Sequence, residues 1–362
     1  MENCLIKKLS SSVIDNTIAK VGCIVLEVVP VETPSAGNRA LHVRTSEGGF
    51  TINVIGDGYM SDNYDTLETD RLTTYTTTDN TEKILYLSNS NFYIEITNKY
   101  RLRQITNYQY PVQSIIVDLA RLKGCANLRQ LSSVLGVVKG DISVFSDMTV
   151  LQYLILSGEN AGVYGDIKSL AGTASLTRLI LPKNVYGDIA NLTSSTNLQY
   201  FSANNSKVTG DLSVFPNNKI RELNIQGSFI YGTLDELGKK ITSQLTSLFL
   251  YDSTTDRYMN GITGTIEGFV ASAVNNNITN GTITARGLFN GLTTFGGTAY
   301  PAQVYTTLVW AGTSKIYIQN SLSADKTIHC KGYSSSEIAE WQSQGYTVTD
   351  VTTGEVYPPT NS

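Results

Sequence analysis

Charged side chains are scarce in this sequence. Asp, Glu, Lys and Arg make up 16% of the 362 residues, whereas soluble domains usually carry about 25%. The net charge at pH 7 is −4, and no run of lysine or arginine exceeds the pairs Lys7-Lys8 and Lys239-Lys240. Proteins that bind nucleic acid usually carry a basic patch or stripe. We therefore expect no nucleic-acid partner.

Histidine and cysteine are also sparse. His42 and His329 lie far apart, and the sequence contains no HExxH, CxxC or nucleophile-elbow motif. It therefore lacks the usual signatures of a metal-ligand set or an activated nucleophile, and we expect no catalytic residue, no cofactor and no metal. The cysteines are scattered and are expected to be reduced and mostly buried, with a Cys4–Cys23 disulfide as the alternative. They are Cys4, Cys23, Cys125 and Cys330.

Long apolar runs are missing as well. No stretch approaches the ~20 apolar residues of a transmembrane helix. The run at residues 21–31 contains Glu27 and Pro30, which suits a β-strand better than the apolar core of an export signal. Ser, Thr, Asn, Gly and 21 tyrosines take the place of the charges. Such side chains make the adaptable hydrogen bonds and broad contacts that are typical of recognition surfaces.

A repeat dominates the middle of the sequence. The pair Asp-(Ile/Leu), usually preceded by Gly, recurs at intervals of 23, 25, 22 and 23 residues, and degenerate copies follow at Thr233 and Thr265. A leucine that opens an L-x-x-L segment lies ten residues after each of the first four aspartates. The constant spacing between the Asp-(Ile/Leu) pair and the L-x-x-L segment predicts a solenoid. In a solenoid, stacked units bury the apolar faces that one unit alone would expose. The aspartates are Asp118, Asp141, Asp166, Asp188 and Asp211, and the leucines are Leu128, Leu151, Leu176 and Leu198.

The sequence motif of the repeat resembles that of the leucine-rich-repeat family. Residues 176–184, LTRLILPKN, match the family segment L-x-x-L-x-L-x-x-N at every position. The sequences V-Y-G-D-I and V-T-G-D-L around Asp166 and Asp211 resemble the L-x-G-x-I turn of the plant-type subclass. The resemblance covers about residues 102–290. It implies a solenoid of stacked short strands that binds a partner, and it leaves the partner open because the family binds many kinds.

The flanking regions have a different pattern. Residues 1–100 contain five short runs of β-branched and aromatic residues separated by turn-rich segments, which predict an all-β attachment domain, either a sandwich or a barrel. The fold class is thus mainly β, with a leucine-rich-repeat solenoid over residues 101–325. A strand–helix cap and tail are expected over residues 326–362, where Ser334 and Glu337 have capping-box spacing.

Alignment of the repeats predicts which strand residues face outward. Each strand turns three residues to the concave face, and several of these are apolar or aromatic and lie beside an arginine. Exposed aromatic residues near arginine commonly mark a binding surface. The candidate partner-binding residues are Tyr153, Ile155, Arg178, Ile180, Tyr200, Glu222, Phe249 and Tyr251. The alternative is that a neighbouring subunit, or the N-terminal domain of the same chain, covers this patch.

Acidic residues are interpreted as structural. The five repeated aspartates are expected to cap the turns that follow them, by accepting backbone N–H hydrogen bonds, and a calcium-binding column is the alternative. The acidic residues between Asp57 and Asp70 lack EF-hand spacing, so we expect a solvated loop there.

The leading functional hypothesis is a non-enzymatic bacteriophage virion protein, with a structural, decorating or host-recognising role. It would bind other virion proteins, or a protein or glycan of the host surface, as part of a larger assembly or homo-oligomer. Its basis is a recognition-type composition without an export signal. A bacterial surface or secreted leucine-rich-repeat adhesin is the alternative. A glycan-processing enzyme with an accessory repeat domain is third, because paired carboxylates can meet in space without a sequence motif.

Overall fold

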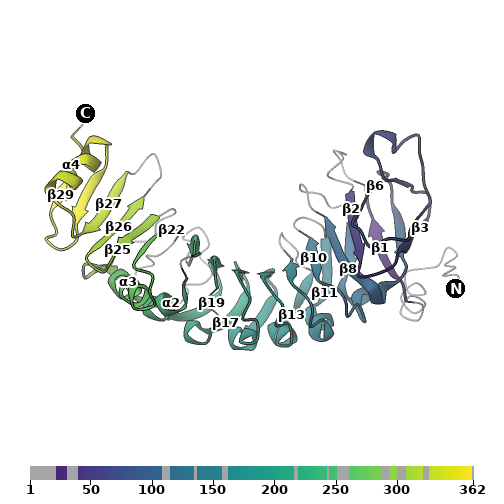
Figure 1. Ribbon diagram of the computed structural model, residues 1–362, viewed down its shortest axis with the longest axis horizontal. Helices are drawn as coiled ribbons and strands as arrows, with labels where there is room; N and C mark the ends of the chain where they lie inside the picture. The colour runs from purple at the N-terminus through teal and green to yellow at the C-terminus, as the bar shows by residue number, and fades with distance from the viewer. Residues whose placement is uncertain are drawn as a thin grey trace. The chain divides into compact units, whose positions relative to one another are not determined.

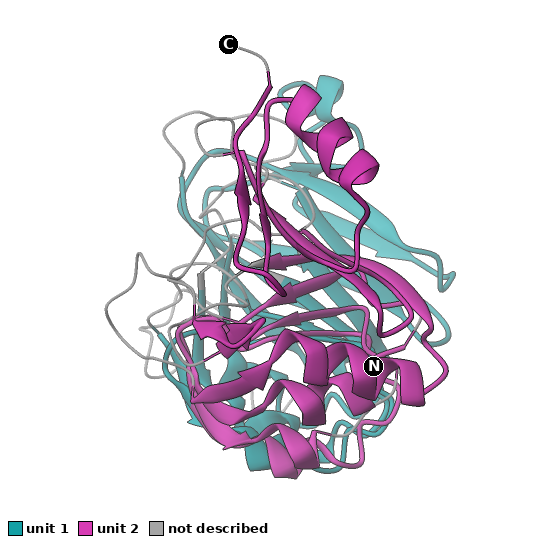
Figure 2. Cartoon of the chain, turned by 90° about the vertical axis from the view of Figure 1, so that its left-hand side faces the viewer, with its two compact units in different colours: residues 1–185 teal, residues 186–362 magenta. Residues whose placement is uncertain are grey.

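The computed structural model of the chain describes eleven segments, which form two compact units, residues 1–185 and 186–362 (Figures 1 and 2). The described residues are 22–30, 40–107, 115–133, 137–156, 162–215, 219–242, 244–250, 261–286, 293–299, 307–320 and 326–360. Each unit contributes strands to two sheets, which we call the first sheet and the second sheet.

Each repeat of unit 1 forms one coil with a strand in each sheet and a short 3-10 helix. The first sheet contains the parallel strands β8 (Leu102–Asn107), β10 (Gln130–Ser133), β12 (Tyr153–Ile155) and β14 (Arg178–Ile180). The second sheet contains the parallel strands β9 (Ile115–Asp118), β11 (Val137–Asp141) and β13 (Val163–Asp166). The helices η4 (Leu119–Leu122), η5 (Ile142–Asp147) and η6 (Ile167–Leu170) follow the second-sheet strands directly.

Unit 2 continues the same plan. Its parallel first-sheet strands are β16 (Tyr200–Ser202), β18 (Glu222–Asn224), β20 (Ser247–Phe249) and β22 (Asn280–Arg286). Its second-sheet strands are β15 (Val185–Asp188, which begins at the last residue of unit 1), β17 (Lys207–Asp211), β19 (Phe229–Thr233), β21 (Ile262–Thr265) and β23 (Thr293–Phe295). The 3-10 helices η7 (Ile189–Leu192) and η8 (Leu212–Val214) give way to true α-helices, α2 (Leu234–Lys240) and α3 (Ile266–Asn275).

The leucines of the repeat form the core. Alternation along a strand buries every second side chain, so Leu154 and Leu179 are fully buried between residues that face outward. The core residues expected from the repeat alignment are all buried, and the leucine-rich-repeat architecture of this region is confirmed. They are Leu151, Leu154, Leu156, Leu176, Leu179, Leu181, Leu198, Leu223, Ile225, Leu248 and Leu250.

The five N-terminal runs are strands, as expected. They are β1 (Ile24–Val28), β2 (Ala40–Thr45), β3 (Phe50–Ile55), β6 (Lys83–Leu87) and β7 (Phe92–Ile96), with shorter elements β4 (Met60–Ser61), η2 (Tyr64–Thr66), β5 (Thr74–Thr77) and η3 (Lys99–Arg101) among them. Strand β1 pairs antiparallel with β9, and β2 pairs antiparallel with β8. Both solenoid sheets therefore continue into the N-terminal region. A freestanding sandwich that ends at residue 100 stays a prediction.

The C-terminal region extends the first sheet of unit 2. The strands β25 (Thr307–Ala311), β26 (Lys315–Asn320) and β27 (Thr327–Lys331) join β22 in antiparallel order, and β28 (Thr347–Asp350) and β29 (Val356–Tyr357) complete the sheet. A short strand β24 (Thr298–Ala299) pairs with β23. Helix α4 (Ser335–Ser343) begins with the expected capping box of Ser334 and Glu337. Its Ile338 packs with Ile328, Cys330 and Val348. Among the described residues, no helix has the length and apolar character needed to span a membrane.

Candidate binding face

The outer face of the first sheet is the side opposite the leucine core. In unit 1, strand pairing places two rows of side chains on it. Gln104, Gln130, Tyr153 and Arg178 form one row, and Thr106, Ser132, Ile155 and Ile180 form the other. Thr106 and Ser132 are buried, so the second row reaches the surface only at Ile155 and Ile180. Successive members of a row lie on adjacent strands, which are about 4.8 Å apart.

Four of the predicted site residues come together on this face of unit 1. Tyr153 lies opposite Arg178, and Ile155 lies opposite Ile180. Tyr153 is 39% exposed, and the other three are half-buried. We call these four residues the unit 1 patch. It is an aromatic and aliphatic surface with one cationic side chain.

Three further predicted residues lie on the outer face of unit 2. Tyr200 is opposite Glu222, and Ser247 continues that row. Phe249 is opposite Asn224 in the neighbouring row. All five are half-buried. This part of the face carries an anionic side chain where the unit 1 patch carries a cationic one. Tyr251 lies outside the described residues.

A third outward-facing column, expected from the alignment, is wrong at two positions. Pro182 and Gln226 are buried, although Asn204 is exposed as expected. The strands end at Ile180, Ser202 and Asn224, so strand alternation does not extend to this third position.

The repeated aspartates make one recurring contact. In each case the Oδ1 atom accepts a hydrogen bond from the backbone N–H two residues later, at the start of the 3-10 helix. The distances are 3.1 Å for Asp118, 2.8 Å for Asp141, 2.9 Å for Asp166, 2.8 Å for Asp188 and 2.8 Å for Asp211. The degenerate copies Thr233 and Thr265 cap α2 and α3 through their hydroxyls. This contact satisfies one otherwise unpaired N–H per coil.

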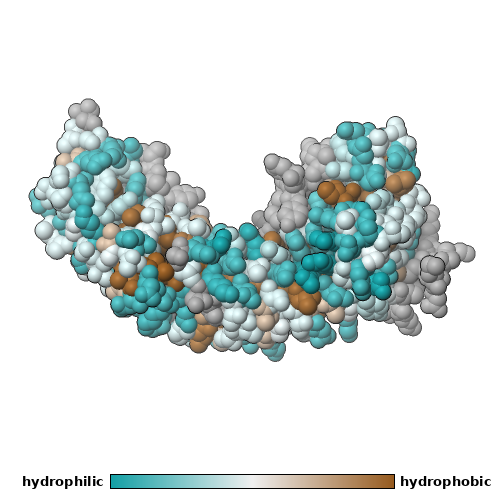
Figure 3. Space-filling model, in the orientation of Figure 1, coloured by the Kyte–Doolittle hydropathy of each residue, from teal (hydrophilic) through white to brown (hydrophobic). Residues whose placement is uncertain are grey.

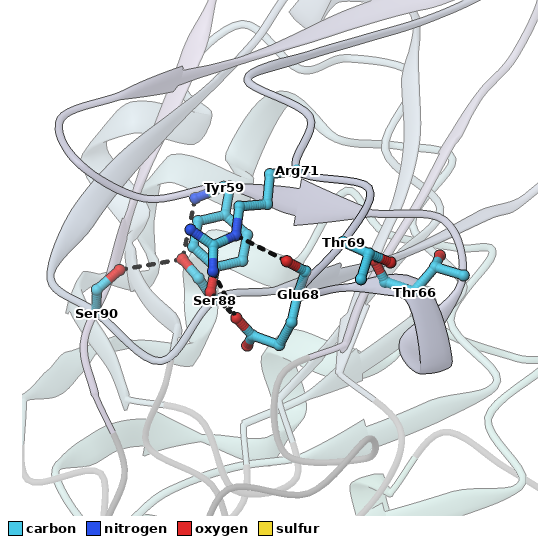
Figure 4. A network of polar contacts seen from close by, with 7 residues as sticks. All are labelled: Tyr59, Thr66, Glu68, Thr69, Arg71, Ser88 and Ser90. Atoms are coloured by element: carbon cyan, nitrogen blue, oxygen red, sulfur yellow. Dashed lines mark hydrogen bonds and ion pairs between the residues drawn. The ribbon is translucent and has the colours of Figure 1, made fainter.

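The acidic N-terminal segment forms internal polar contacts. Arg71 lies over the ring of Tyr59, 4.5 Å from its centroid, and donates to Glu68 at 3.2 Å (Figure 4). Tyr59 also donates its hydroxyl to Glu68. Within the described residues, no group of three or more His, Cys, Asp or Glu side chains is arranged to hold a metal ion.

Two of the described thiols are buried and poorly suited to act as nucleophiles. Cys23, Cys125 and Cys330 are buried, and Cys125 and Cys330 are free. Burial raises the pKa of each of these two thiols to about 12. The reactive thiolate is therefore rare at neutral pH. Cys4 lies outside the described residues.

Sequence reasoning missed one set of exposed aromatic residues. Tyr164 and Tyr186 are 52% and 49% exposed on the second sheet, and Tyr231 and Phe229 are also exposed there. The signal was present, because a tyrosine precedes the glycine in three copies of the repeat. That segment was interpreted as a turn, whereas it forms a strand.

Comparison with known proteins gives structural matches alone. No protein-family model and no curated protein sequence matches the chain. Internalin C2 from Listeria monocytogenes is 16% identical over 48% of this chain and 84% of that structure, with a TM-score of 0.31. The leucine-rich-repeat ectodomain of the Arabidopsis receptor kinase HAESA, in complex with an IDA peptide hormone, is 14% identical over 51% of this chain, with a TM-score of 0.34. The PEPR1–AtPEP1 structure is 16% identical over 44% of this chain, with a TM-score of 0.31.

The chain spans 34% of the HAESA ectodomain structure and 25% of the PEPR1 structure. For these three structures the sequence identity does not exceed 16% and the TM-score does not exceed 0.34. The assignment of a leucine-rich-repeat solenoid therefore rests on the coils of this chain, with their parallel strands, buried leucines and capped turns.

Proposed function

We propose that this chain is a non-enzymatic binding protein whose partner docks on the outer face of the first sheet. The observation that supports this most directly is the unit 1 patch. Tyr153 stands exposed on a strand whose next residue, Leu154, is fully buried. A rigid core thus holds an aromatic ring in contact with solvent beside an arginine, and such residues supply most of the free energy at protein interfaces.

The solenoid would also keep the entropic cost of binding low. Each outer-face residue is fixed on a strand whose neighbours are hydrogen-bonded on both sides. A surface that is already ordered loses little conformational freedom when a partner docks.

We further propose that the protein acts in a bacteriophage particle, as a decorating or host-recognising component. The composition supports this, because hydroxyl, amide and phenol groups dominate at the expense of charge. An exposed adhesin of a bacterial surface is the second candidate setting and draws on the same composition.

A four-site variant tests the binding face. Tyr153→Ser and Tyr200→Ser remove the aromatic rings, and Ile155→Thr and Ile180→Thr remove aliphatic surface while keeping β-branched side chains. We expect a folded protein, verified by circular dichroism and thermal melting, that fails to enter particles or to adsorb to host cells. Removal of aromatic anchors commonly costs over ~2 kcal/mol each. Wild-type behaviour of the folded variant in both assays would refute the proposal.

A further inference from the structure

Three arginines gather at the N-terminal end of the first sheet. Arg44 on β2 lies opposite Gln104 on β8, and Arg103 precedes Gln104, where the pairing register of the two strands shifts. The backbone N–H of Arg129 donates to the carbonyl oxygen of Arg103 at 2.8 Å. Burial lowers the pKa of Arg103, and repulsion from Arg129 and Arg44 lowers it further, so the three guanidinium groups are close enough to repel one another. We call Arg44, Arg103 and Arg129 the arginine cluster.

The arginine cluster forms no ion pair with a carboxylate of the described residues. Arg44 donates to the carbonyl oxygen of Asn80 at 3.0 Å. The neighbouring carboxylate, Glu82, accepts a hydrogen bond from Gln104 at 2.6 Å and contacts His42 at 3.2 Å. Strongly hydrophilic residues gather over the area of β8 and β10 (Figure 3). This end of the first sheet therefore carries surplus positive charge.

The segment of residues 57–71 carries the opposite charge. It contains five carboxylates against one arginine, a net charge of −4, which equals the net charge of the whole chain. Glu68 pairs with Arg71. The other four carboxylates are exposed and form no ion pair with a described residue. We call these four the acidic patch, and they are Asp57, Asp62, Asp65 and Asp70.

The acidic patch is held in place by its own segment. Met60 and Leu67, which lie between its members in the sequence, are buried. The side chain of Asn63 accepts a hydrogen bond from the backbone N–H of Asp65 at 3.0 Å. A surface that is ordered in this way loses little conformational freedom on association.

The acidic patch and the arginine cluster lie apart on the same chain. Ser61 pairs with Tyr86 on β6, and Tyr86 pairs with Ala40 at the start of β2. Arg44 is four residues further along β2, which is ~13 Å, and β4 is offset from β2 by two strand spacings, which is ~10 Å. Among the described residues no ion pair joins the two surfaces. Each surface is therefore left without its counter-charge within one chain.

We propose that a second copy of this chain supplies the counter-charge, with the arginine cluster of each copy bound to the acidic patch of the other. Guanidinium groups bind carboxylates through charge-assisted hydrogen bonds. A twofold axis between the copies makes this contact twice, because the same pair of surfaces then meets on both sides of the axis.

Charge complementarity selects a second copy as the occupant. A foreign acidic partner would pair with the arginine cluster but would leave the acidic patch without cations, whereas a second copy satisfies both surfaces at once. This inference concerns self-assembly and goes beyond the proposed function, whose unit 1 patch lies on β12 and β14. The four-site variant keeps both charged surfaces and should dimerise as the wild type does, so the two proposals can fail separately.

The first test is sedimentation velocity of the full chain over a concentration series. We expect a monomer–dimer equilibrium at ~0.05 M NaCl, with a dissociation constant that rises at least about tenfold at ~0.5 M NaCl, because salt screens surface charge. A chain that stays monomeric up to ~0.1 mM at the lower salt concentration would overturn the proposal. A dimer whose stability does not change with salt would overturn it as well.

Two charge-reversed variants locate the contact. Arg103→Glu with Arg129→Glu reverses the arginine cluster, and Asp62→Lys with Asp65→Lys reverses the acidic patch. Each variant alone places like charge against like charge, so its dissociation constant should rise at least about tenfold. Circular dichroism and thermal melting verify the fold, and a folded variant of either kind that dimerises as the wild type does would refute the assigned surfaces.

The matched control is Lys183→Glu with Lys207→Glu, at exposed lysines outside both surfaces. It changes the net charge by the same amount as the reversed arginine cluster. Its dissociation constant should stay within about twofold of the wild-type value, since scattered surface charges contribute little. A loss as large as that of the reversed arginine cluster would attribute the effect to net charge and reject the specific contact.

Mixing the two charge-reversed variants is the decisive measurement. In the mixed pair the reversed arginine cluster meets the reversed acidic patch, and the two unaltered surfaces meet each other, so both contacts attract. We expect the mass of a dimer to return on mixing in equal amounts, although each variant alone is monomeric at that concentration. A mixture that stays monomeric would overturn the proposal.

Discussion

The substitution Leu179→Ala probes the stacked core. Leu179 is fully buried on β14 and lies opposite Leu154, which is fully buried on β12. The change removes about three carbon groups, worth ~0.8 kcal/mol each in transfer free energy. A cavity in a rigid interior adds to this loss, and Leu→Ala changes in cores cost ~2–5 kcal/mol. We expect about 3–4 kcal/mol, because paired strands on both sides prevent collapse around the cavity.

The assay is urea-induced unfolding followed by circular dichroism. The control is Tyr164→Thr on β13, where the side chain is 52% exposed and the replacement keeps a β-branched residue. The free energy of unfolding should fall by less than ~0.5 kcal/mol in this control, as is usual for surface substitutions. A loss below ~1 kcal/mol for Leu179→Ala would refute the assigned repeat register.

Three further predictions concern the turns and the C-terminal helix. Gly210 has φ +122°, and a Cβ there would lie 2.4 Å from the capping carboxylate oxygen of Asp188, so Gly210→Ala should lower the free energy of unfolding by at least ~2 kcal/mol in a denaturant melt. In the control Gly172→Ala, the added Cβ would lie 3.7 Å from the carbonyl oxygen of Ser146, and the loss should be far smaller. Asp166→Ala should cost ~1 kcal/mol and Asp166→Asn much less, because Asn also caps; a chelator should leave the melting temperature unchanged, and a fall of several degrees would favour calcium. The pKa of Glu337 is lowered from 4.5 to about 2, chiefly by a hydrogen bond from Lys315. The ionised carboxylate therefore stabilises the fold fully above pH 4.5, and this stabilisation is lost as the pH falls toward 2. The melting temperatures of wild type and Glu337→Gln should converge over that range.

The repeat region could be predicted from sequence because its signal is redundant. Each of the first four copies supplies both an Asp and, ten residues later, the leucine that opens the next strand segment, and alternation then determines which residues are buried. The same redundancy predicts the two outer-face rows, since Tyr153 and Arg178 occupy equal positions in their repeats.

The regions outside the repeat lack that redundancy. The N-terminal runs predict strands, but no local pattern shows that β1 and β2 pair with β9 and β8, because pairing depends on residues distant in sequence. Strand β26 was not predicted, because residues 315–320 carry neither motif of the repeat.

The central claim is that the first sheet, rather than the most exposed aromatic surface, receives the partner. Two matched variants separate these possibilities, each replacing one tyrosine per unit. Tyr153→Ser with Tyr200→Ser alters the first sheet, and Tyr164→Ser with Tyr186→Ser alters the second sheet, where the exposed fractions of 52% and 49% exceed the 39% of Tyr153.

The decisive measurement is adsorption to host cells, and incorporation into particles, by both folded variants at equal concentration. Loss of at least about tenfold is expected for the first-sheet pair, because central aromatic anchors dominate binding, and a change within about twofold is expected for the second-sheet pair. The reverse order of losses would contradict the assignment and move the binding surface to the second sheet.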